Sequence, residues 1–249
     1  MKRFVAWALL VGGCANVAIR EGDAPEDYYR AAQTNLERKN YPEAQVQYVQ
    51  LKTKFPYSKY GTLAELRLAD VKFAEEKYLE AIDAYKMFVQ YHPAHEEVPY
   101  AIYREAQSHY KEIPDDWFFL PPGFEKDQTE ADKAERVLVE FIERYPEHEH
   151  TDVAKKLLRD VRRFLAAHDL YVARFYRRQE KWAGAAARYE FVRVRYGDIG
   201  IEGDVLLELG ESYVKLGDKD KARPLFERLV AEYPATEHAA TAKEWLGKL

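Results

Sequence analysis

Hydrophobic residues recur along much of the chain with the period of an α-helix. In residues 78–89 the apolar positions follow the i, i+3, i+4, i+7 spacing that places them on one helix face. They are Tyr78, Ala81, Ile82, Tyr85, Phe88 and Val89. Residues 134–145 repeat this spacing, with Ala134, Val137, Leu138, Phe141, Ile142 and Tyr145. Each segment is therefore predicted to be an amphipathic helix with one buried face.

Five segments share a longer pattern of small, large apolar and helix-ending residues. A small residue is followed after four positions by a large apolar residue, and after 12 positions by proline or glycine. The five copies are Ala44, Tyr48 and Pro56; Ala81, Tyr85 and Pro93; Ala134, Leu138 and Pro146; Ala185, Tyr189 and Gly197; and Ala222, Phe226 and Pro234. The pattern resembles the tetratricopeptide repeat (TPR), a helix-turn-helix unit of about 34 residues. The resemblance implies an all-α fold, a superhelix of five tetratricopeptide-like repeats whose neighbours stack into one core.

The N-terminus has the pattern of a secretory signal. Lys2 and Arg3 precede an uncharged run over residues 4–13. This run is too short to cross a bilayer, because a membrane-spanning helix needs roughly 20 residues. We therefore predict a signal peptide at residues 1–13.

The signal ends at the only cysteine of the chain, in the sequence Val11-Gly12-Gly13-Cys14. This resembles the bacterial lipobox, in which the signal is cleaved before a cysteine that becomes lipid-modified. The resemblance implies lipidation of Cys14 and a lipidated tether over residues 14–25. Because Ala15 rather than aspartate follows the cysteine, it also implies sorting to the outer membrane, with the protein facing the periplasm. An incidental cysteine after an ordinary signal is the alternative.

Two segments depart from the plain repeat. Residues 114–124 carry three prolines and four large aromatic residues, so they are predicted to form a loop. These aromatic side chains either cover the repeats or form a docking surface. The segment from Thr151 to Gln179 is predicted to be one long helix, with Thr151 and Asp152 at its N-terminal cap.

We accordingly expect two halves. Residues 26–148 hold repeats 1–3 with a loop insertion at 114–126, and residues 149–249 hold the long linking helix with repeats 4–5. The formal net charge of −5, from 38 basic and 43 acidic residues, argues against nucleic acid as a partner, because phosphate binding requires a basic face. A single cysteine also excludes an internal disulfide.

Several short motifs resemble the BamD family, the lipoprotein subunits of the outer-membrane β-barrel assembly machinery. The motifs are Lys54-Phe55-Pro56-Tyr57-Ser58, Asp127-Gln128-Thr129, Arg144-Tyr145-Pro146, and Tyr171-Val172-Ala173-Arg174-Phe175-Tyr176 before Trp182. Arg195-Tyr196-Gly197-Asp198 departs from the family, which usually has Tyr-Pro there. The resemblance implies a periplasmic protein that binds the central barrel subunit through its POTRA domains, unfolded outer-membrane proteins and other assembly lipoproteins. It also implies no catalytic activity and no cofactor.

The resemblance further implies that the N-terminal repeats receive the C-terminal targeting segment of a client. An aromatic residue with a terminal carboxylate needs an apolar surface beside a basic group. Candidates on the first helices of the repeats, which line the concave face of a TPR array, are Tyr28, Tyr60, Arg67, Tyr100, Tyr103 and Arg104. Ordinary packing or a solvated surface is the alternative interpretation of each.

The C-terminal half contains a dense run of arginines, of which Arg174, Arg188 and Arg193 are candidates for the interface with the central subunit. Arg188 is preferred, because it aligns with a basic residue of the family helix that follows Trp182. The alternative is a solvated helix face whose arginines pair with residues such as Glu190.

No metal or catalytic site is predicted. The clusters His92, His95, Glu96, Glu97 and His148-Glu149-His150 flank the repeat-ending prolines, where solvated turns are expected, and they lack the spacing of a zinc site. No nucleophile elbow, phosphate loop or dinucleotide fingerprint is present in the sequence. The competing functions are a different periplasmic TPR lipoprotein that organises cell-wall or division machinery, and a cell-wall hydrolase.

Overall fold

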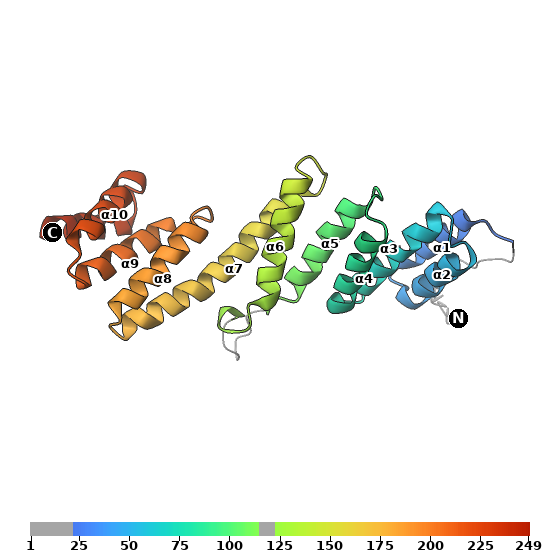
Figure 1. Cartoon of the computed structure of the whole chain (residues 1–249), viewed down its shortest axis with the longest axis horizontal. Coiled ribbons are helices and arrows are strands. Elements are labelled where there is room, and N and C mark those ends of the chain that lie inside the picture. The colour runs from blue at the N-terminus through green and yellow to red at the C-terminus, as the bar shows by residue number, and fades with distance from the viewer. Residues whose placement is uncertain (1–21, 115–122) are drawn as a thin grey trace, which may run out of the picture. The chain divides into compact units, whose positions relative to one another are not determined.

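The computed structural model describes residues 22–114 and 123–249, so residues 1–13, Cys14 and most of the loop insertion lie outside the described residues. The described chain is all α-helical apart from one 3₁₀ turn at Gly123–Glu125 (Figure 1). The helices are α1 (Pro25–Glu37), α2 (Tyr41–Lys54), α3 (Lys59–Ala74), α4 (Tyr78–Tyr91), α5 (Val98–Lys111), α6 (Thr129–Arg144), α7 (Thr151–Arg178), α8 (Trp182–Arg195), α9 (Glu202–Lys215), α10 (Lys219–Glu232) and α11 (Glu237–Lys248).

Successive helices form five pairs, from α1 with α2 to α9 with α10, and the small residues lie where the paired helices cross. The five alanines of the repeat pattern, Ala44, Ala81, Ala134, Ala185 and Ala222, have no exposed surface. The large residues four positions later are also fully buried. The prediction of an all-α fold built from TPR-like repeats is therefore confirmed.

The turn inside four of these pairs uses a residue with positive φ. Lys39, Glu76, Glu180 and Gly217 have φ between 55° and 78°. In each turn the next residue donates its backbone N–H to a carbonyl five residues earlier, for example from Lys181 to Tyr176 at 3.0 Å. This is the Schellman arrangement, which satisfies carbonyls at a helix C-terminus and requires the left-handed conformation that glycine adopts most easily.

The chain forms two compact units, one ending at Pro93 and the other beginning at Ala94. The first unit contains α1–α4, and its core includes Tyr28, Ala44, Tyr48 and Leu51. The second contains α5–α11, so residues 94–148 belong to the same unit as the long helix. The division of the chain between residues 148 and 149 stays a prediction.

The long helix α7 begins at Thr151, as predicted, but its cap differs from the expectation. His150 occupies the N-cap position and makes no capping hydrogen bond with its side chain. Thr151 is already helical and buried, and its hydroxyl donates to the carbonyl of Tyr145 at 2.6 Å. The hydroxyl therefore ties the helix to the preceding turn rather than capping the helix.

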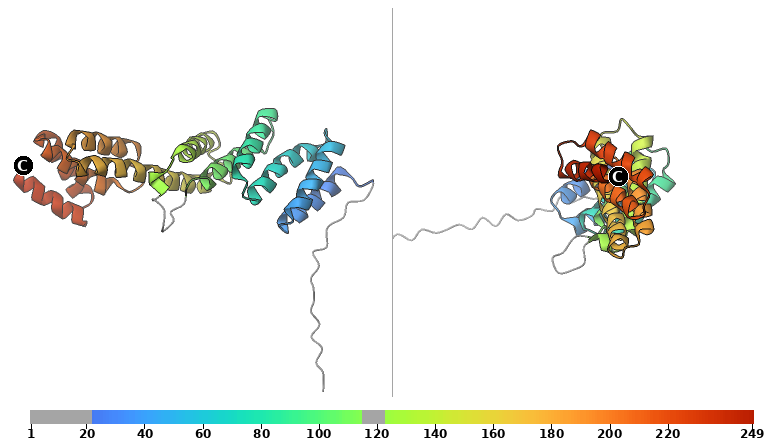
Figure 2. Two further views of the ribbon diagram at one scale, coloured as in Figure 1. Left: turned by 90° about the horizontal axis from the view of Figure 1, so that it is seen from below. Right: turned by 90° about the vertical axis from the view of Figure 1, so that its left-hand side faces the viewer.

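A C-terminal helix, α11, covers the last repeat and was not expected from the repeat pattern. Its residue Trp245 stacks on Phe226 of α10, with ring centroids 6.3 Å apart and an interplanar angle of 5°. The indole N–H donates to Glu211 of α9 at 3.3 Å. Figure 2 shows α11 in red at the C-terminal end, beside the helices it covers. The helix closes the apolar face that the fifth repeat would otherwise expose.

The end of the loop insertion is anchored on α7. The ring of Phe124 lies 5.7 Å from that of Tyr171, and His168 Nδ1 donates to the Phe124 carbonyl at 2.6 Å. Phe124 therefore packs on the repeats, whereas the other three aromatic residues of the loop lie outside the described residues.

Candidate functional site

An aromatic surface forms on α1 and α3 of the first unit. The rings of Tyr29 and Tyr60 lie 5.5 Å apart, and Arg67 Nε donates to the Tyr29 hydroxyl at 3.1 Å. Both tyrosines are half-buried, so each still presents part of its ring to solvent. Lys59 Nζ lies 4.9 Å from the centre of the Tyr60 ring, which adds an exposed cation at the edge. We call Tyr29, Lys59, Tyr60 and Arg67 the aromatic–basic surface.

Tyr28, which we expected on this surface, belongs to the core instead. Only 2% of it is exposed, its ring packs edge-on against Phe55, and its hydroxyl accepts a hydrogen bond from Lys54 at 2.7 Å. Its neighbour Tyr29 takes the expected place. The signal was present in the sequence, because Tyr28, Ala31, Ala32 and Asn35 follow the spacing of one buried helix face.

Arg67 is held in place by a buried carboxylate. Its Nη1 lies 2.8 Å from Oδ2 of Asp70, whose other oxygen accepts from the Tyr85 hydroxyl at 2.6 Å. Burial alone would lower the pKa of Arg67, but Asp70 and Tyr29 more than offset this and raise it. Because Asp70 already balances this charge, Lys59 is the more available cation of the surface. Lys59 is not among the residues that the repeat pattern indicates for the groove.

The other three residues proposed for the groove lie together in the second unit. On α5, the Tyr103 ring lies 4.6 Å and the Tyr100 ring 5.8 Å from the imidazole of His150, and the Arg104 guanidinium lies 5.9 Å from the centre of the Tyr100 ring. Tyr103 is only 6% exposed, so it contributes mainly to packing. Tyr100 and Arg104 form the accessible part of this cluster.

The two histidine clusters are less solvated than expected. His150 is half-buried against these rings, and this burial lowers the pKa of its imidazole. In the first unit, His92 Nε2 donates to Glu65 at 2.9 Å. Among residues 22–114 and 123–249, no group of three or more His, Cys, Asp or Glu side chains is arranged to hold a metal ion.

The candidate interface arginines have different partners. Arg174 Nε donates to both carboxylate oxygens of Glu208 on α9, each at 3.1 Å. Arg193 forms a two-point contact with Glu190 of its own helix, at 2.6 and 3.1 Å. A carboxylate therefore already balances the charge of each guanidinium group. For Arg193 this agrees with the alternative interpretation, in which the arginines pair with residues such as Glu190.

Arg188 is the most available of the three arginines. Its Nη1 lies 3.5 Å from Oδ1 of Asp169, at the limit of a hydrogen bond, and 46% of its side chain is exposed. Burial raises the pKa of Asp169, and the charge of Arg188 only partly opposes this. Most donors of the Arg188 guanidinium thus remain accessible to a partner.

Successive helix pairs with buried small residues in the repeat pattern define a protein of the tetratricopeptide-repeat class. Residues 21–225 match the sequence profile of the YfiO family, described as outer membrane lipoprotein, and residues 207–249 match a tetratricopeptide repeat profile. Because the first match spans most of the chain, the protein belongs to this family of outer membrane lipoproteins, the BamD family.

Similar relatives carry the name outer membrane protein assembly factor BamD. The one from Xylella fastidiosa strain 9a5c is 26% identical, over 94% of this chain and 83% of the relative. The one from Rickettsia prowazekii is 27% identical, over 80% of this chain and 76% of the relative. A solved TPR protein from Thermus thermophilus is 14% identical over 91% of this chain and 100% of its own, with a TM-score of 0.39. No helix in the described part of the chain has the length and apolar character needed to span a bilayer.

Proposed function

We propose that this protein is a periplasm-facing lipoprotein of the outer membrane, anchored through Cys14, that helps to assemble β-barrel proteins. It binds the central barrel subunit, through that subunit's POTRA domains, and the targeting segments of unfolded outer-membrane proteins. The family match and the names of the relatives support the assembly role. The action is binding, with no catalytic step.

The aromatic–basic surface carries the client-binding part of the proposal. A C-terminal aromatic residue would stack on the exposed parts of Tyr29 and Tyr60, which lie 5.5 Å apart. Its carboxylate would reach Lys59, whose Nζ lies over the Tyr60 ring. Arg67, fixed by Asp70, holds Tyr29 through its hydroxyl and so keeps the aromatic floor rigid. A rigid floor lowers the ordering cost of binding.

A titration with two peptides tests this surface. One peptide ends in phenylalanine with a free carboxylate, and the other is identical except for a C-terminal amide. We expect the amide to bind the wild-type protein about tenfold more weakly, the loss typical of removing one charge-assisted contact. We expect Lys59→Ala to abolish this difference, because the variant lacks the cation that reads the carboxylate.

Tyr57→Ala is the matched control, since Tyr57 is fully exposed and lies two residues from Lys59. It should leave both affinities unchanged. If the wild-type protein binds the two peptides equally, this surface is not the client site. If Tyr57→Ala weakens binding as much as Lys59→Ala does, the carboxylate contact lies elsewhere.

A further inference from the structure

A second surface of the first unit lies on the face of α3 roughly opposite Arg67. One face of α3 carries Glu65, Leu68 and Lys72, which are separated by three and four residues. Arg67 and Asp70 lie on the opposite side of the helix axis. With the end of α2 and the outer side of α4 they enclose a groove of about 380 Å³. We call it the α3–α4 groove.

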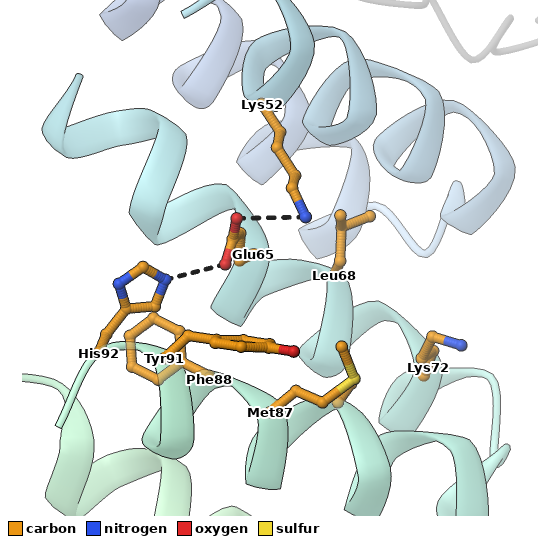
Figure 3. Close-up of a pocket in the computed structure, with 9 residues that line it drawn as sticks. Lys52, Glu65, Leu68, Lys72, Met87, Phe88, Tyr91 and His92 are labelled. Atoms are coloured by element: carbon orange, nitrogen blue, oxygen red, sulfur yellow. Dashed lines mark hydrogen bonds and ion pairs between the residues drawn. The ribbon is translucent and has the colours of Figure 1, made fainter. Parts of the chain in front are cut away.

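Apolar side chains form the floor and one wall of this groove. Leu68, Met87 and Tyr91 line the groove, and the ring of Phe88 lies beside that of His92, with centroids 5.1 Å apart (Figure 3). Met87 and Tyr91 are 52% and 64% exposed, although both are large and apolar enough to favour burial. Met87 is unbranched and flexible, so it can adapt its shape to different apolar partners.

Charged groups lie at the two ends of the groove. At one end Glu65 accepts from His92 at 2.9 Å and pairs with Lys52 at 3.2 Å. At the other end Lys72 pairs with Glu80 at 2.6 Å. The side chains of Lys52 and Lys72 are 51% and 35% exposed. An ammonium group has three donors, so each lysine can donate to its present carboxylate and also to a second one.

The mixed signs of these charges favour a peptide over a lipid as the occupant. Two lysines attract carboxylates, while Glu65 between Lys52 and His92 accepts N–H groups. A polypeptide segment offers backbone N–H donors, acidic side chains and apolar side chains together. Phosphatidylglycerol offers an apolar chain and acceptors, but it has no N–H donor for Glu65.

We propose that the α3–α4 groove binds a segment of a partner protein in which a large apolar side chain is flanked by carboxylates. The apolar side chain lies on Leu68, Met87 and Tyr91, and the carboxylates reach Lys52 and Lys72. The first unit thereby binds two ligands on different faces of α3. The proposal is independent of the aromatic–basic surface, because the two surfaces share no residue.

The methyl group of Met87 offers a direct readout. The chain has two methionines, Met1 and Met87, and Met1 lies in the predicted signal peptide. A mature chain that begins at position 14 with Cys14→Ser, labelled with ¹³C at the methionine methyl, therefore gives one signal from the groove. The probe is a synthetic peptide with leucine and phenylalanine between aspartates, blocked at both ends so that it lacks a terminal carboxylate.

We expect the Met87 signal to shift and saturate with this peptide. Lys72→Glu should weaken binding about tenfold, because it replaces an attraction with a repulsion. Lys77→Glu is the matched control: Lys77 is also exposed and pairs with a glutamate, Glu75 at 2.9 Å, but lies outside the groove. It should change the affinity less than twofold, as should Lys59→Ala on the other surface.

Three outcomes would overturn the proposal. They are an unshifted Met87 signal at millimolar peptide, an equal shift with a peptide whose aspartates are replaced by lysines, and a shift produced only by phosphatidylglycerol micelles. Because the probe has blocked ends, failure here leaves the client-binding proposal standing, and failure of the two-peptide titration leaves this one standing.

Discussion

A Cβ atom at Gly210 would lie 2.5 Å from Cε1 of Phe226, a separation that real side chains do not tolerate. Glycine at this helix crossing is therefore what allows α9 and α10 to pack around a fully buried phenylalanine. Movement of the ring is restricted, because Trp245 of α11 stacks on it.

Gly210→Ala should therefore destabilise the second unit. Overpacking typically costs about 1–3 kcal/mol, and the better helix propensity of alanine offsets at most about 1 kcal/mol of this. Gly203→Ala on the same helix is the control, since its Cβ would meet only Leu229 at 3.8 Å, an ordinary contact. Urea unfolding followed by tryptophan fluorescence should show a lower midpoint for Gly210→Ala alone. Equal midpoints for the two variants would contradict the packing described here.

Glu180→Gly should stabilise the second unit. Glu180 has φ of 55°, and a side chain in this left-handed region costs roughly 1 kcal/mol relative to glycine. Part of this gain is lost to the greater freedom of glycine in the unfolded chain, so we expect an increase of about 0.5 kcal/mol. The reciprocal variant, Gly217→Ala at the equivalent turn with φ of 78°, should lower the stability. The prediction fails if Glu180→Gly lowers the unfolding midpoint.

The charge of Asp169 should make the stability of the second unit depend on pH. Burial raises the pKa of this carboxyl above its unfolded value, so the folded state favours the protonated form. The contribution of the Asp169 carboxyl to the free energy of unfolding is therefore fully present below its unfolded pKa. This contribution is lost as the pH rises through its folded pKa.

Asp169→Asn, which stays neutral, should be more stable than the wild-type protein at pH 7, and the difference should shrink in acid. Its amide oxygen can still accept a hydrogen bond from Tyr196, which donates to Asp169 at 3.4 Å. Unfolding midpoints between pH 4 and 7, values chosen to bracket roughly the carboxyl range, measure this difference. A difference that does not change with pH would contradict it.

Arg188→Glu should weaken binding to the central subunit more than Arg193→Glu does. Arg188 is exposed and only loosely held by Asp169, whereas Arg193 is neutralised by a two-point contact with Glu190. We expect a loss of at least about tenfold for Arg188→Glu, because reversing the charge replaces an attraction with a repulsion. Surface plasmon resonance with the isolated POTRA domains measures both variants. A larger effect at Arg193 would exclude Arg188 as the main contact.

The sequence predicts the repeats well because each crossing depends on local spacing. Ala44 and Tyr48, for example, are fully buried where the pattern places them. The positive-φ turns were less visible, since Lys39, Glu76 and Glu180 occupy positions where glycine would have been the signal. The helix α11 was missed because it follows the last Pro of the pattern and does not begin a further copy of it.

Individual site residues were harder to predict than the faces they share. Tyr28 and Tyr29 are neighbours, so a shift of one residue, about 100° around a helix, separates a core residue from a surface one. The partner of Arg174, Glu208 on α9, depends on which helices pack together, which spacing alone does not determine. Glu190, the partner of Arg193, lies three residues away on the same helix, so spacing could indicate it. The α3–α4 groove likewise requires three helices to converge, so no single segment of the sequence indicates it.

The most direct test of the assembly role is quantitative mass spectrometry of proteins that co-purify with the lipidated wild-type protein from solubilised outer membranes, with Arg188→Glu as the paired sample. We expect a large β-barrel protein with periplasmic POTRA domains to co-purify with the wild-type protein and to be depleted with the variant. Co-purification of cell-wall or division proteins alone, unchanged by Arg188→Glu, would contradict the assembly role and favour a different periplasmic scaffold.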